Sequence, residues 1–482
     1  MVLRPTTPKA RRDATRIINL LKGHPSPSLL PAPLISEATQ RVLSAPSTST
    51  PALLYGADEG YPPLRRSLAH WLNDFYGDAR RAYAAQQGTT APATLQDVDD
   101  ETARITITGG ASQSLGVILS TFTDPAYTRT VFMAVPAYYL AFKIFQDAGF
   151  AGRMQPVPED EEGIDVADLR RQLREQQQSQ EVESRAADPN GWRGHKPASV
   201  YEKVYRHVVY VVPTYANPSS RTMSIRRREE LVRVAREFDA LVVCDDVYDM
   251  LQWPRGDRRA VHAEKAQMPR VVDVDQYLAP RPGGEAFGIV VSNASFSKIL
   301  GPGMRSGWVE ASSKFAFRLS QTGVQKSGGA PNQFAGVCIN DLLERGKLQH
   351  HVHNTLRPSY ERRWRRMRQA VAQHLEPLGV SVVEQTPHEG SSGLAGGYFI
   401  WITLPKPLHS KKVAEGATLV GLIVASGESF EIPNLPEDSR AAAPPTRFPG
   451  SLRLCFAYED ESVLQEGVQR LAGVITHLQC DN

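Results

Sequence analysis

The sequence predicts an α/β fold with a mostly parallel sheet, followed by a smaller α+β domain at the carboxyl end. In the larger, amino-terminal part, short β-branched segments alternate with apolar helical segments, which is typical of parallel strands joined by crossover helices. Toward the carboxyl end, helices and strands alternate without that regular order. The length of 482 residues, with 41% hydrophobic and 22% charged residues, indicates a soluble globular protein of two or three domains.

The amino-terminal segment is rich in Pro, Ser and Thr, so we expect residues 1–50 to form an extended arm. One apolar stretch, Ile17–Leu21, interrupts it. A loop punctuated by Gly and Pro, Leu54–Arg65, leads into an amphipathic helix, Leu64–Tyr76. The polar residues 77–101 are interpreted as a surface excursion.

Strand–turn–helix units follow this excursion. The expected strands are Arg104–Thr108, Val131–Val135, His207–Val212 and Leu241–Cys244. The expected helices are Leu115–Phe122, Tyr138–Gly149 and Ile225–Phe238. Residues 172–203 are poor in apolar side chains and are interpreted as a solvent-exposed insertion. Ligands of such sheets bind at the carboxyl ends of the strands, which is where the polar motifs of this sequence fall.

The carboxyl-terminal part begins near a helix that ends at about Arg345. A long helix near Tyr360–Leu375 follows, and the six arginines within Arg357–Arg368 are interpreted as its solvated face. Later elements are a loop excursion and two strands: Pro433–Pro449, Gly397–Ile402 and Ser451–Cys455. We therefore expect an arm or lid over residues 1–50, a large domain over 51–345, and a small domain over 346–482 that packs with part of the arm.

Composition excludes several classes of function. The net charge of +3 is too small to indicate nucleic-acid binding. The histidines at 350, 351 and 353 have no second group of ligands nearby in the sequence, so no metal site is expected. No apolar run approaches the roughly 20 residues of a membrane span. The widely spaced cysteines indicate reduced thiols, and we expect a cytoplasmic protein, with the basic residues from Arg4 to Arg16 leaving a transit peptide open.

The stretch Ser295–Trp308 brings an amine and a guanidinium to one turn. Lys298 follows the β-rich run Phe287–Ser292, and Arg305 lies seven residues farther on, beyond a Gly-Pro-Gly turn. A desolvated lysine loses its proton readily and attacks aldehydes, whereas arginine keeps its charge and binds phosphate. The pair favours a site for a phosphorylated aldehyde such as pyridoxal phosphate. An isolated Ser-x-x-Lys is more often a surface loop with two ordinary cations, so the other motifs decide.

Four other motifs fall at or near expected strand ends. Gly109–Gln113 opens a helix after a strand, where free backbone N–H groups form a phosphate seat. Asn217 stands in an Asn-Pro turn, and Asp245 and Tyr248 follow another strand. Arg453 lies within an apolar strand, where its charge needs an anionic partner. Each motif alone is weak, since Gly-Gly and Asn-Pro pairs also occur as simple turn chemistry.

Taken in this order, the motifs resemble those of the fold-type I aminotransferases of class I/II, in particular the branch of aromatic and 2-aminoadipate aminotransferases. The resemblance runs from about Tyr55 to Tyr458. It implies that the large domain, 51–345, has the three-layer cofactor-binding architecture of that family and binds pyridoxal 5'-phosphate. It also implies a Schiff base and proton transfer at Lys298, and pairing of the pyridine nitrogen with Asp245.

The resemblance implies further contacts to the cofactor and the substrate. Their expected positions are Asn217 and Tyr248 at the ring hydroxyl, Tyr138 on the ring face, Ala111, Ser112, Ser295 and Arg305 at the phosphate, Tyr55 at the partner subunit's phosphate, and Arg453 at the substrate carboxylate. Two segments depart from the family pattern. The family's Asn-Pro-x-Gly reads Asn217–Ser220 here, and its late Pro-Gly-x-x-Phe reads Ala425–Phe430, close to where side-chain selectivity is set.

The implied activity is the transfer of an amino group from a large α-amino acid, aromatic or 2-aminoadipate-like, to a 2-oxo acid such as 2-oxoglutarate. Enzymes of this branch use their amino-terminal segment as a lid, and Asn19–Pro25, with Gly23 toward the substrate, has the apolar and hinge-like character of one. A lyase or oxidase with the same cofactor is the alternative, because pocket details decide the outcome of the reaction.

The resemblance also implies a homodimer, in which Tyr55 and Ser327–Gly329 lie near the partner's site. A cofactor-sensing transcriptional regulator would carry an amino-terminal DNA-binding domain. Residues 1–50 are too short and too rich in proline for one.

Overall fold

The computed structural model describes residues 16–184, 196–197, 200–256, 263–279, 287–329, 331–384, 393–433 and 447–480. Within them, an eight-stranded sheet forms the centre of the larger lobe, in the order β2-β10-β9-β7-β6-β3-β4-β5. Strands β4, β3, β6, β7 and β9 are parallel, and β10 is antiparallel to both of its neighbours. The strands are β2 (Ile105–Thr108), β3 (Thr130–Val135), β4 (Met154–Asp160), β5 (Gly163–Ile164), β6 (His207–Val211), β7 (Ala240–Asp245), β9 (Val290–Ser295) and β10 (Gly307–Glu310).

Helices cover this sheet, as the expected α/β fold requires. Every residue of β6, β7 and β9 is buried, which is the signature of parallel strands covered on both faces. The helices of this lobe are α3 (Pro62–Gln86), α4 (Leu95–Asp100), α5 (Ala111–Phe122), α6 (Tyr139–Phe145), α7 (Val166–Ser184), α8 (Ile225–Glu237), α9 (Val271–Tyr277), α10 (Ser313–Ser320) and α11 (Gln333–Glu344). The expected strand–helix order is confirmed.

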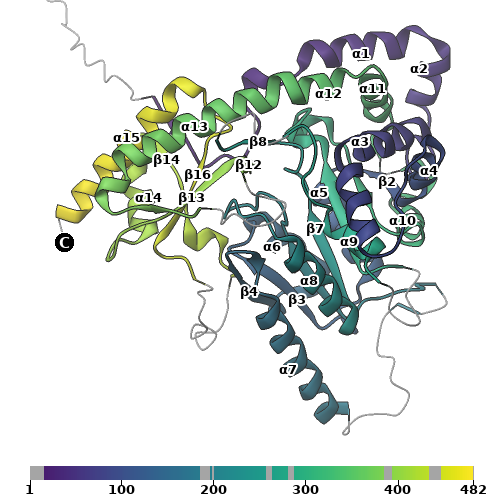
Figure 1. The fold of residues 1–482 in the computed structure, drawn as a ribbon, viewed down its shortest axis with the longest axis horizontal. Helices are drawn as coiled ribbons and strands as arrows, with labels where there is room; N and C mark the ends of the chain where they lie inside the picture. Colours follow the sequence, from purple (N-terminus) through teal and green to yellow (C-terminus); the bar gives the residue numbers. More distant parts are fainter. Residues whose placement is uncertain are drawn as a thin grey trace, which may run out of the picture.

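The smaller lobe contains an antiparallel sheet in the order β11-β13-β16-β15. Its elements are α12 (Lys347–His351), α13 (Arg357–His374), β11 (Ser381–Val382), β13 (Phe399–Thr403), α14 (Ser410–Leu419), β14 (Leu422–Ile423), β15 (Ala425–Ser426), β16 (Ser451–Cys455) and α15 (Glu461–Cys480). Figure 1 shows α13 running beside α15 along one side of this lobe, with the short pair β8 (Gln252–Pro254) and β12 (Leu394–Gly396) between the lobes.

The amino-terminal arm is more regular than expected. Strand β1 (Ile18–Asn19) pairs with β14, and two helices follow, α1 (Ala32–Ser44) and α2 (Pro46–Leu53). Both helices carry proline in the first turn, where the missing N–H costs nothing, so the proline-rich composition does not prevent helix formation. They lie beside α11 (Figure 1), where Arg41 pairs with Asp341 at 2.7 Å. The prediction of an extended arm is therefore wrong for residues 32–53.

Two further segments are helical where loops were expected. Helix α3 continues through Gln86 and buries Tyr83 and Ala84, so residues 77–101 are not simply a surface excursion. Helix α7 covers the first part of the segment 172–203, which was interpreted as an insertion. Both segments are rich in polar residues and still form helices. A low content of apolar residues therefore does not distinguish a loop from a helix with an exposed face. Much of the remaining insertion, and most of the expected loop 433–449, lies outside the described residues.

The basic helix α13 is not simply a solvated face. Arg357 and Arg363 are buried, and their guanidinium groups donate to backbone carbonyls of Met250 at 2.7 Å and Ala457 at 3.1 Å. Such contacts satisfy buried N–H groups with backbone oxygens. These two arginines join the helix to segments of both lobes.

Some simple properties can be stated for the described part of the chain. No helix there has the length and apolar content needed to cross a membrane. No group of three or more His, Cys, Asp and Glu residues suited to a metal ion occurs within it. All four cysteines are free thiols.

A buried ionic cluster joins α3, α9 and β10. Arg80 contacts Asp273 at 2.7 Å and Glu310 at 3.0 Å, and Arg270 contacts Glu310 at 2.7 Å. Burial alone would raise the pKa of Asp273, but Arg270 and Arg80 outweigh burial and hold it at about 2. The four charges compensate one another, so removal of one leaves an unpaired charge in the interior.

We predict that Glu310→Gln destabilises the fold by roughly 3 kcal/mol, because two buried guanidinium groups then share one carboxylate. Asp147→Asn removes a carboxylate from an exposed pair with Lys143 and should cost at most about 1 kcal/mol. Urea denaturation followed by circular dichroism measures both changes. Equal effects of the two substitutions would contradict the assignment of a structural role to the cluster.

Candidate active site

A cavity of about 270 Å³ lies where the carboxyl ends of β6, β7 and β9 meet. The turn after β9, the start of α5 and the amino-terminal arm also contribute to its wall. Among the side chains and backbone that line it are all but one of the predicted site residues: Gly23, Ala111, Ser112, Tyr138, Asn217, Asp245, Tyr248, Ser295, Lys298, Arg305 and Arg453. The exception is Tyr55.

Lys298 ends a short 3₁₀ turn, Phe296–Lys298, that follows β9 directly. Its Nζ donates to the backbone carbonyl of Gly23 at 2.8 Å and lies 5.6 Å and 5.5 Å from the ring centroids of Tyr248 and Tyr398. Burial lowers the pKa of Lys298 to about 8, although the negative charge of Asp245 acts in the opposite direction. The amine is therefore partly uncharged near neutral pH, as a nucleophile must be.

Asp245 is the last residue of β7 and is buried. Its Oδ2 accepts a hydrogen bond from the Tyr210 hydroxyl at 2.7 Å, while its Oδ1 is buried without a partner. Burial raises the pKa of this carboxyl to about 6, and the hydrogen bond from Tyr210 acts in the opposite direction. Tyr210 was not among the predicted site residues, since it occurs in an apolar strand where nothing in the local sequence distinguishes it from a core aromatic.

Helix α5 begins at the cavity and offers an uncapped amino terminus. Gly110, its N-cap residue, has φ +102° and makes no side-chain capping bond. The Arg305 Nη2 donates to the carbonyl of Gly109 at 2.8 Å, and Ser295 Oγ lies beside Ser297 Oγ at 2.8 Å. A cation, hydroxyl groups and free backbone N–H groups thus converge on one space, which is the chemistry of an anion site.

Gly307 makes this convergence possible. A Cβ at Gly307 would lie 2.5 Å from the carbonyl oxygen of Ala294 and 2.9 Å from the Cα of Gly110. No side chain fits at such distances, so β10 approaches the start of α5 only because this residue is glycine.

Arg453 lies on β16 with its guanidinium 4.1 Å from the Phe399 ring centroid and 4.9 Å from that of Phe430. It donates to Asn217 Oδ1 at 2.7 Å and to the carbonyl of Leu21 at 2.5 Å. The aromatic rings hold the planar cation, and the two neutral acceptors leave its charge uncompensated. No carboxylate of the described residues pairs with Arg453, so its charge is available to an anionic ligand.

The arm closes the cavity from one side. Leu21, Gly23 and Pro25 line the wall. A Cβ at Gly23 would lie 2.7 Å from Cζ of Phe399, so this close approach of the arm requires glycine.

Two of the predicted ring contacts, Tyr138 and Tyr248, differ in burial. Tyr138 immediately precedes α6 and is half-buried, whereas Tyr248 is buried, with its ring 5.9 Å from that of Phe399. Burial raises the pKa of the Tyr248 hydroxyl well above its ordinary value, so it remains a neutral donor. Both tyrosines line the cavity that contains Lys298.

Tyr55 lies away from the cavity and is 86% exposed. It neighbours the turn Ser327–Gly329, since a Cβ at Gly328 would lie 2.4 Å from the carbonyl oxygen of Gly56 and the Ser327 N–H donates to Asp58 at 2.7 Å. The two segments predicted to lie near a partner's site therefore contact one another on the surface.

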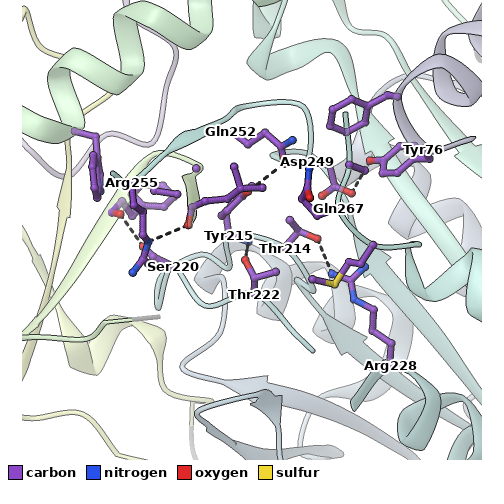
Figure 2. A pocket seen from close by; sticks show the side chains of 18 residues that line it. Tyr76, Thr214, Tyr215, Ser220, Thr222, Arg228, Asp249, Gln252, Arg255 and Gln267 are labelled. Carbon is purple, nitrogen blue, oxygen red and sulfur yellow. Dashed lines mark hydrogen bonds between the residues drawn. The ribbon is translucent and has the colours of Figure 1, made fainter. Parts of the chain in front are cut away.

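A second, smaller cavity of about 60 Å³ lies behind the turn that carries Asn217. Figure 2 shows Thr214, Tyr215 and Ser220 of this turn together with Asp249 and Gln252. The Tyr215 hydroxyl donates to Gln252 at 3.2 Å, and Ser220 donates to the carbonyl of Phe399 at 2.6 Å. These contacts hold the turn that carries Asn217 in place. Ser220 therefore has a structural role here, whereas the sequence alone showed Ser219 and Ser220 only as departures from the family motif.

Comparison with known proteins identifies the family. The model of the family aminotransferase class I and II matches residues 17–471, so the chain belongs to that family. An uncharacterized protein of Saccharomyces cerevisiae is 32% identical over 429 residues, 86% of this chain and 88% of that one. An aromatic-amino-acid aminotransferase of Thermococcus litoralis is 26% identical over 467 residues, 96% and 89% of the two chains. A 2-aminoadipate transaminase of Thermus thermophilus is 24% identical over 463 residues, 96% and 91%.

Solved structures agree with this family. A kynurenine aminotransferase of Pyrococcus horikoshii, in complex with PMP, superimposes with a TM-score of 0.68 at 28% identity, covering 96% of this chain and 92% of that one. The chain is therefore a transaminase with the fold-type I architecture, and the resemblance to the aromatic and 2-aminoadipate branch is confirmed.

The family implies pyridoxal phosphate, and the residues of the cavity fit it. The unpartnered Oδ1 of Asp245 matches a protonated ring nitrogen, which is a hydrogen-bond donor. The uncapped start of α5 beside Arg305 matches a phosphate. The half-buried amine of Lys298, whose pKa desolvation lowers, matches an aldehyde.

We predict that the amine of Lys298 in cofactor-free protein reacts with acetic anhydride at a rate that rises with pH and is half-maximal near pH 8, because burial lowers its pKa to about that value. Asp245→Asn removes the charge that favours the ammonium form, so its half-maximal pH should lie below that of the wild-type protein. Peptide mass spectrometry across a pH series measures both. A half-maximal rate near pH 10.5 would show that the amine is not desolvated.

Proposed function

We propose that this protein is a pyridoxal phosphate-dependent aminotransferase in which Lys298 and Asp245 carry the chemistry. The observation that carries the proposal is the meeting of a half-buried lysine amine, a buried carboxylate with one unpartnered oxygen and an uncapped helix terminus in one cavity. Pyridoxal phosphate would supply an aldehyde that condenses with amines and a ring that accepts electrons from the substrate.

Each residue has a role that follows from its position. Lys298 would bind the cofactor covalently and, once released by the amino acid, accept and return the proton at the substrate α-carbon. Asp245 would hold the ring nitrogen in its protonated form through its free oxygen. The remaining roles are hydrogen bonds to the ring hydroxyl from Asn217 and Tyr248, stacking by Tyr138, and phosphate binding by Ser295, Arg305 and the backbone of Ala111 and Ser112.

Arg453 would bind the α-carboxylate of the substrate. Its guanidinium presents a fork of donors, now shared between Asn217 and the carbonyl of Leu21. A carboxylate carries full charge, whereas the carbonyl of Leu21 does not, so a substrate can displace the arm from this position. Substrate entry therefore requires the arm to move.

The amino donor is proposed to be large, either aromatic or 2-aminoadipate-like, with a 2-oxo acid such as 2-oxoglutarate as acceptor. Leu21 of the arm and Tyr139, Leu140 and Ile144 of α6 line the same cavity as Lys298 and Arg453 with largely apolar surface. Burial of apolar surface is worth roughly 25 cal/mol per Å², so a phenyl-sized side chain should gain about 2 kcal/mol over a methyl group. The names of two relatives, an aromatic-amino-acid aminotransferase and a 2-aminoadipate transaminase, support this range of donors.

A homodimer with composite sites is also proposed, and Tyr55 is the residue that crosses to the partner. The Tyr55 side chain lies next to a Gly-rich turn and is 86% exposed, so it buries little surface within a single chain. In a symmetric pair the same two segments would meet the partner's phosphate site.

A cytoplasmic location is proposed on the basis of the cysteines. All four thiols are free, and three of them, Cys244, Cys338 and Cys455, are buried. Free thiols are typical of reducing compartments.

The test of function is a comparison of kcat/KM for four donors with 2-oxoglutarate as the common acceptor. We expect phenylalanine or 2-aminoadipate to exceed alanine by about 10-fold or more, because the larger side chains bury more apolar surface. Aspartate should be poor, since its short side chain places a second carboxylate against apolar residues. A preference for aspartate or alanine would reject the proposed donor class.

The same assay separates transamination from other outcomes. Product formation that requires no 2-oxo acid acceptor would favour a lyase or an oxidase instead. Borohydride reduction followed by peptide mass spectrometry should place the cofactor on Lys298, and Lys298→Ala should abolish the adduct. An adduct on another lysine would reject the assignment of Lys298.

Composite sites predict complementation between two inactive variants. Tyr55→Ala and Lys298→Ala chains should each be inactive or nearly so as homodimers, because each lacks one part of every site. A mixed dimer should regain up to about half of the activity of a wild-type dimer, because one of its two sites contains both residues. Proven heterodimers without activity would contradict the placement of Tyr55.

A further inference from the structure

The Tyr210–Asp245 hydrogen bond is a feature to which the family resemblance assigns no role. Tyr210 lies on β6, is 2% exposed, and is one of the residues that line the active-site cavity. Its ring packs edge-on against Phe145, with centroids 5.8 Å apart and an interplanar angle of 78°. The phenol is therefore held in one orientation, with its oxygen 2.7 Å from Asp245 Oδ2.

We propose that Tyr210 is a positioning residue for the cofactor ring, because it fixes Asp245 so that only Oδ1 remains available to the ring nitrogen. This inference rests on the proposed function of Asp245. Among the described residues, Tyr210 is the one hydrogen-bond donor to this carboxylate. Without it, both oxygens of a buried carboxylate would lack a partner, and the group could rotate between two equivalent orientations.

The hydrogen bond also acts on the charge of Asp245. A donor to a carboxylate stabilises its ionised form, which opposes the effect of burial. A carboxylate that keeps its negative charge pairs with a protonated ring nitrogen, and a carboxyl that holds its own proton does not. The charge of Lys298 also favours the ionised form of Asp245, whereas the charge of Asp246 disfavours it. Tyr210 differs from both because it acts through a hydrogen bond and carries no charge.

Position in the sheet explains why a tyrosine serves here. Strands β6 and β7 are adjacent and parallel, with Tyr210 opposite Val243 and Val211 opposite Cys244. Tyr210 therefore starts two positions below Asp245 along the strand direction, and its long ring spans that offset. A serine or threonine at Tyr210 would be too short to span two residues of strand, about 6.6 Å.

The test uses Tyr210→Phe, which removes only the hydroxyl, and Tyr205→Phe as a matched control. Tyr205 is also buried, but its hydroxyl donates to the backbone carbonyl of Gly288 at 2.6 Å, and it does not line the cavity. Pyridoxamine phosphate is the first probe, because it carries the ring and the phosphate but cannot react with Lys298. Inorganic phosphate is the second probe, because it tests the phosphate seat without the ring.

We expect Tyr210→Phe to weaken pyridoxamine phosphate binding by about 10-fold or more, the size expected for loss of a hydrogen bond to a charged group. Phosphate binding should remain unchanged, and Tyr205→Phe should change neither. With the complete enzyme, kcat should fall by a similar factor while KM for the amino donor stays constant, since Arg453 is untouched. Unchanged pyridoxamine phosphate affinity in Tyr210→Phe would overturn the proposal.

A double-mutant cycle shows whether the hydroxyl acts through the carboxylate. In an Asp245→Asn background, Tyr210→Phe should change pyridoxamine phosphate affinity by less than about 2-fold, because the charged acceptor is gone. An equal loss in both backgrounds would mean that Tyr210 acts only through packing. The measurement is of cofactor binding, so it tests Tyr210 even if the wild-type enzyme catalyses a reaction other than transamination. If pyridoxamine phosphate does not bind the wild-type protein at all, the proposed function and the role of Tyr210 are both wrong.

Discussion

The register of three adjacent parallel strands determines where chemistry is possible in this protein. Strands β6, β7 and β9 run side by side, and Asp245 pairs with Asn293 across β7 and β9. Their carboxyl ends meet at one edge of the sheet, so Tyr210, Asp245 and Lys298 reach the same cavity although they are far apart in sequence. A shift of one residue in any strand would turn its functional side chain to the opposite face.

Burial at that edge creates the electrostatic conditions of the site. Desolvation lowers the pKa of Lys298 to about 8 and raises that of Asp245 to about 6, so each group is moved toward neutrality by its surroundings. Neither group has an oppositely charged partner in direct contact in the described structure. In the proposed function, the cofactor would supply the missing complement, an aldehyde for the amine and a cationic ring for the acid.

Local sequence carried enough information for the strands, the turns at their ends and the residues in those turns. Lys298, Asp245, Asn217 and Arg453 could be predicted because the motifs that contain them occur together in the order of a known family, although most of these motifs alone have an ordinary structural explanation. Tyr210 could not be predicted, because a tyrosine in a buried strand is ordinary until its hydroxyl partner is known. Helix α7 and the helices of the arm were missed for a related reason, since tertiary packing and proline in the first turn override composition.

The arm contacts the site through its main chain. The carbonyl groups of Leu21 and Gly23 accept hydrogen bonds from Arg453 and Lys298, and every amino acid supplies such a carbonyl. Substitutions at Leu21 or Lys22 would therefore alter the surface that meets a substrate side chain while leaving closure over the two cations intact. Gly23 alone is constrained, by the ring of Phe399. This arrangement ties closure of the cavity to main-chain atoms and makes it independent of the side chains of Leu21 and Lys22.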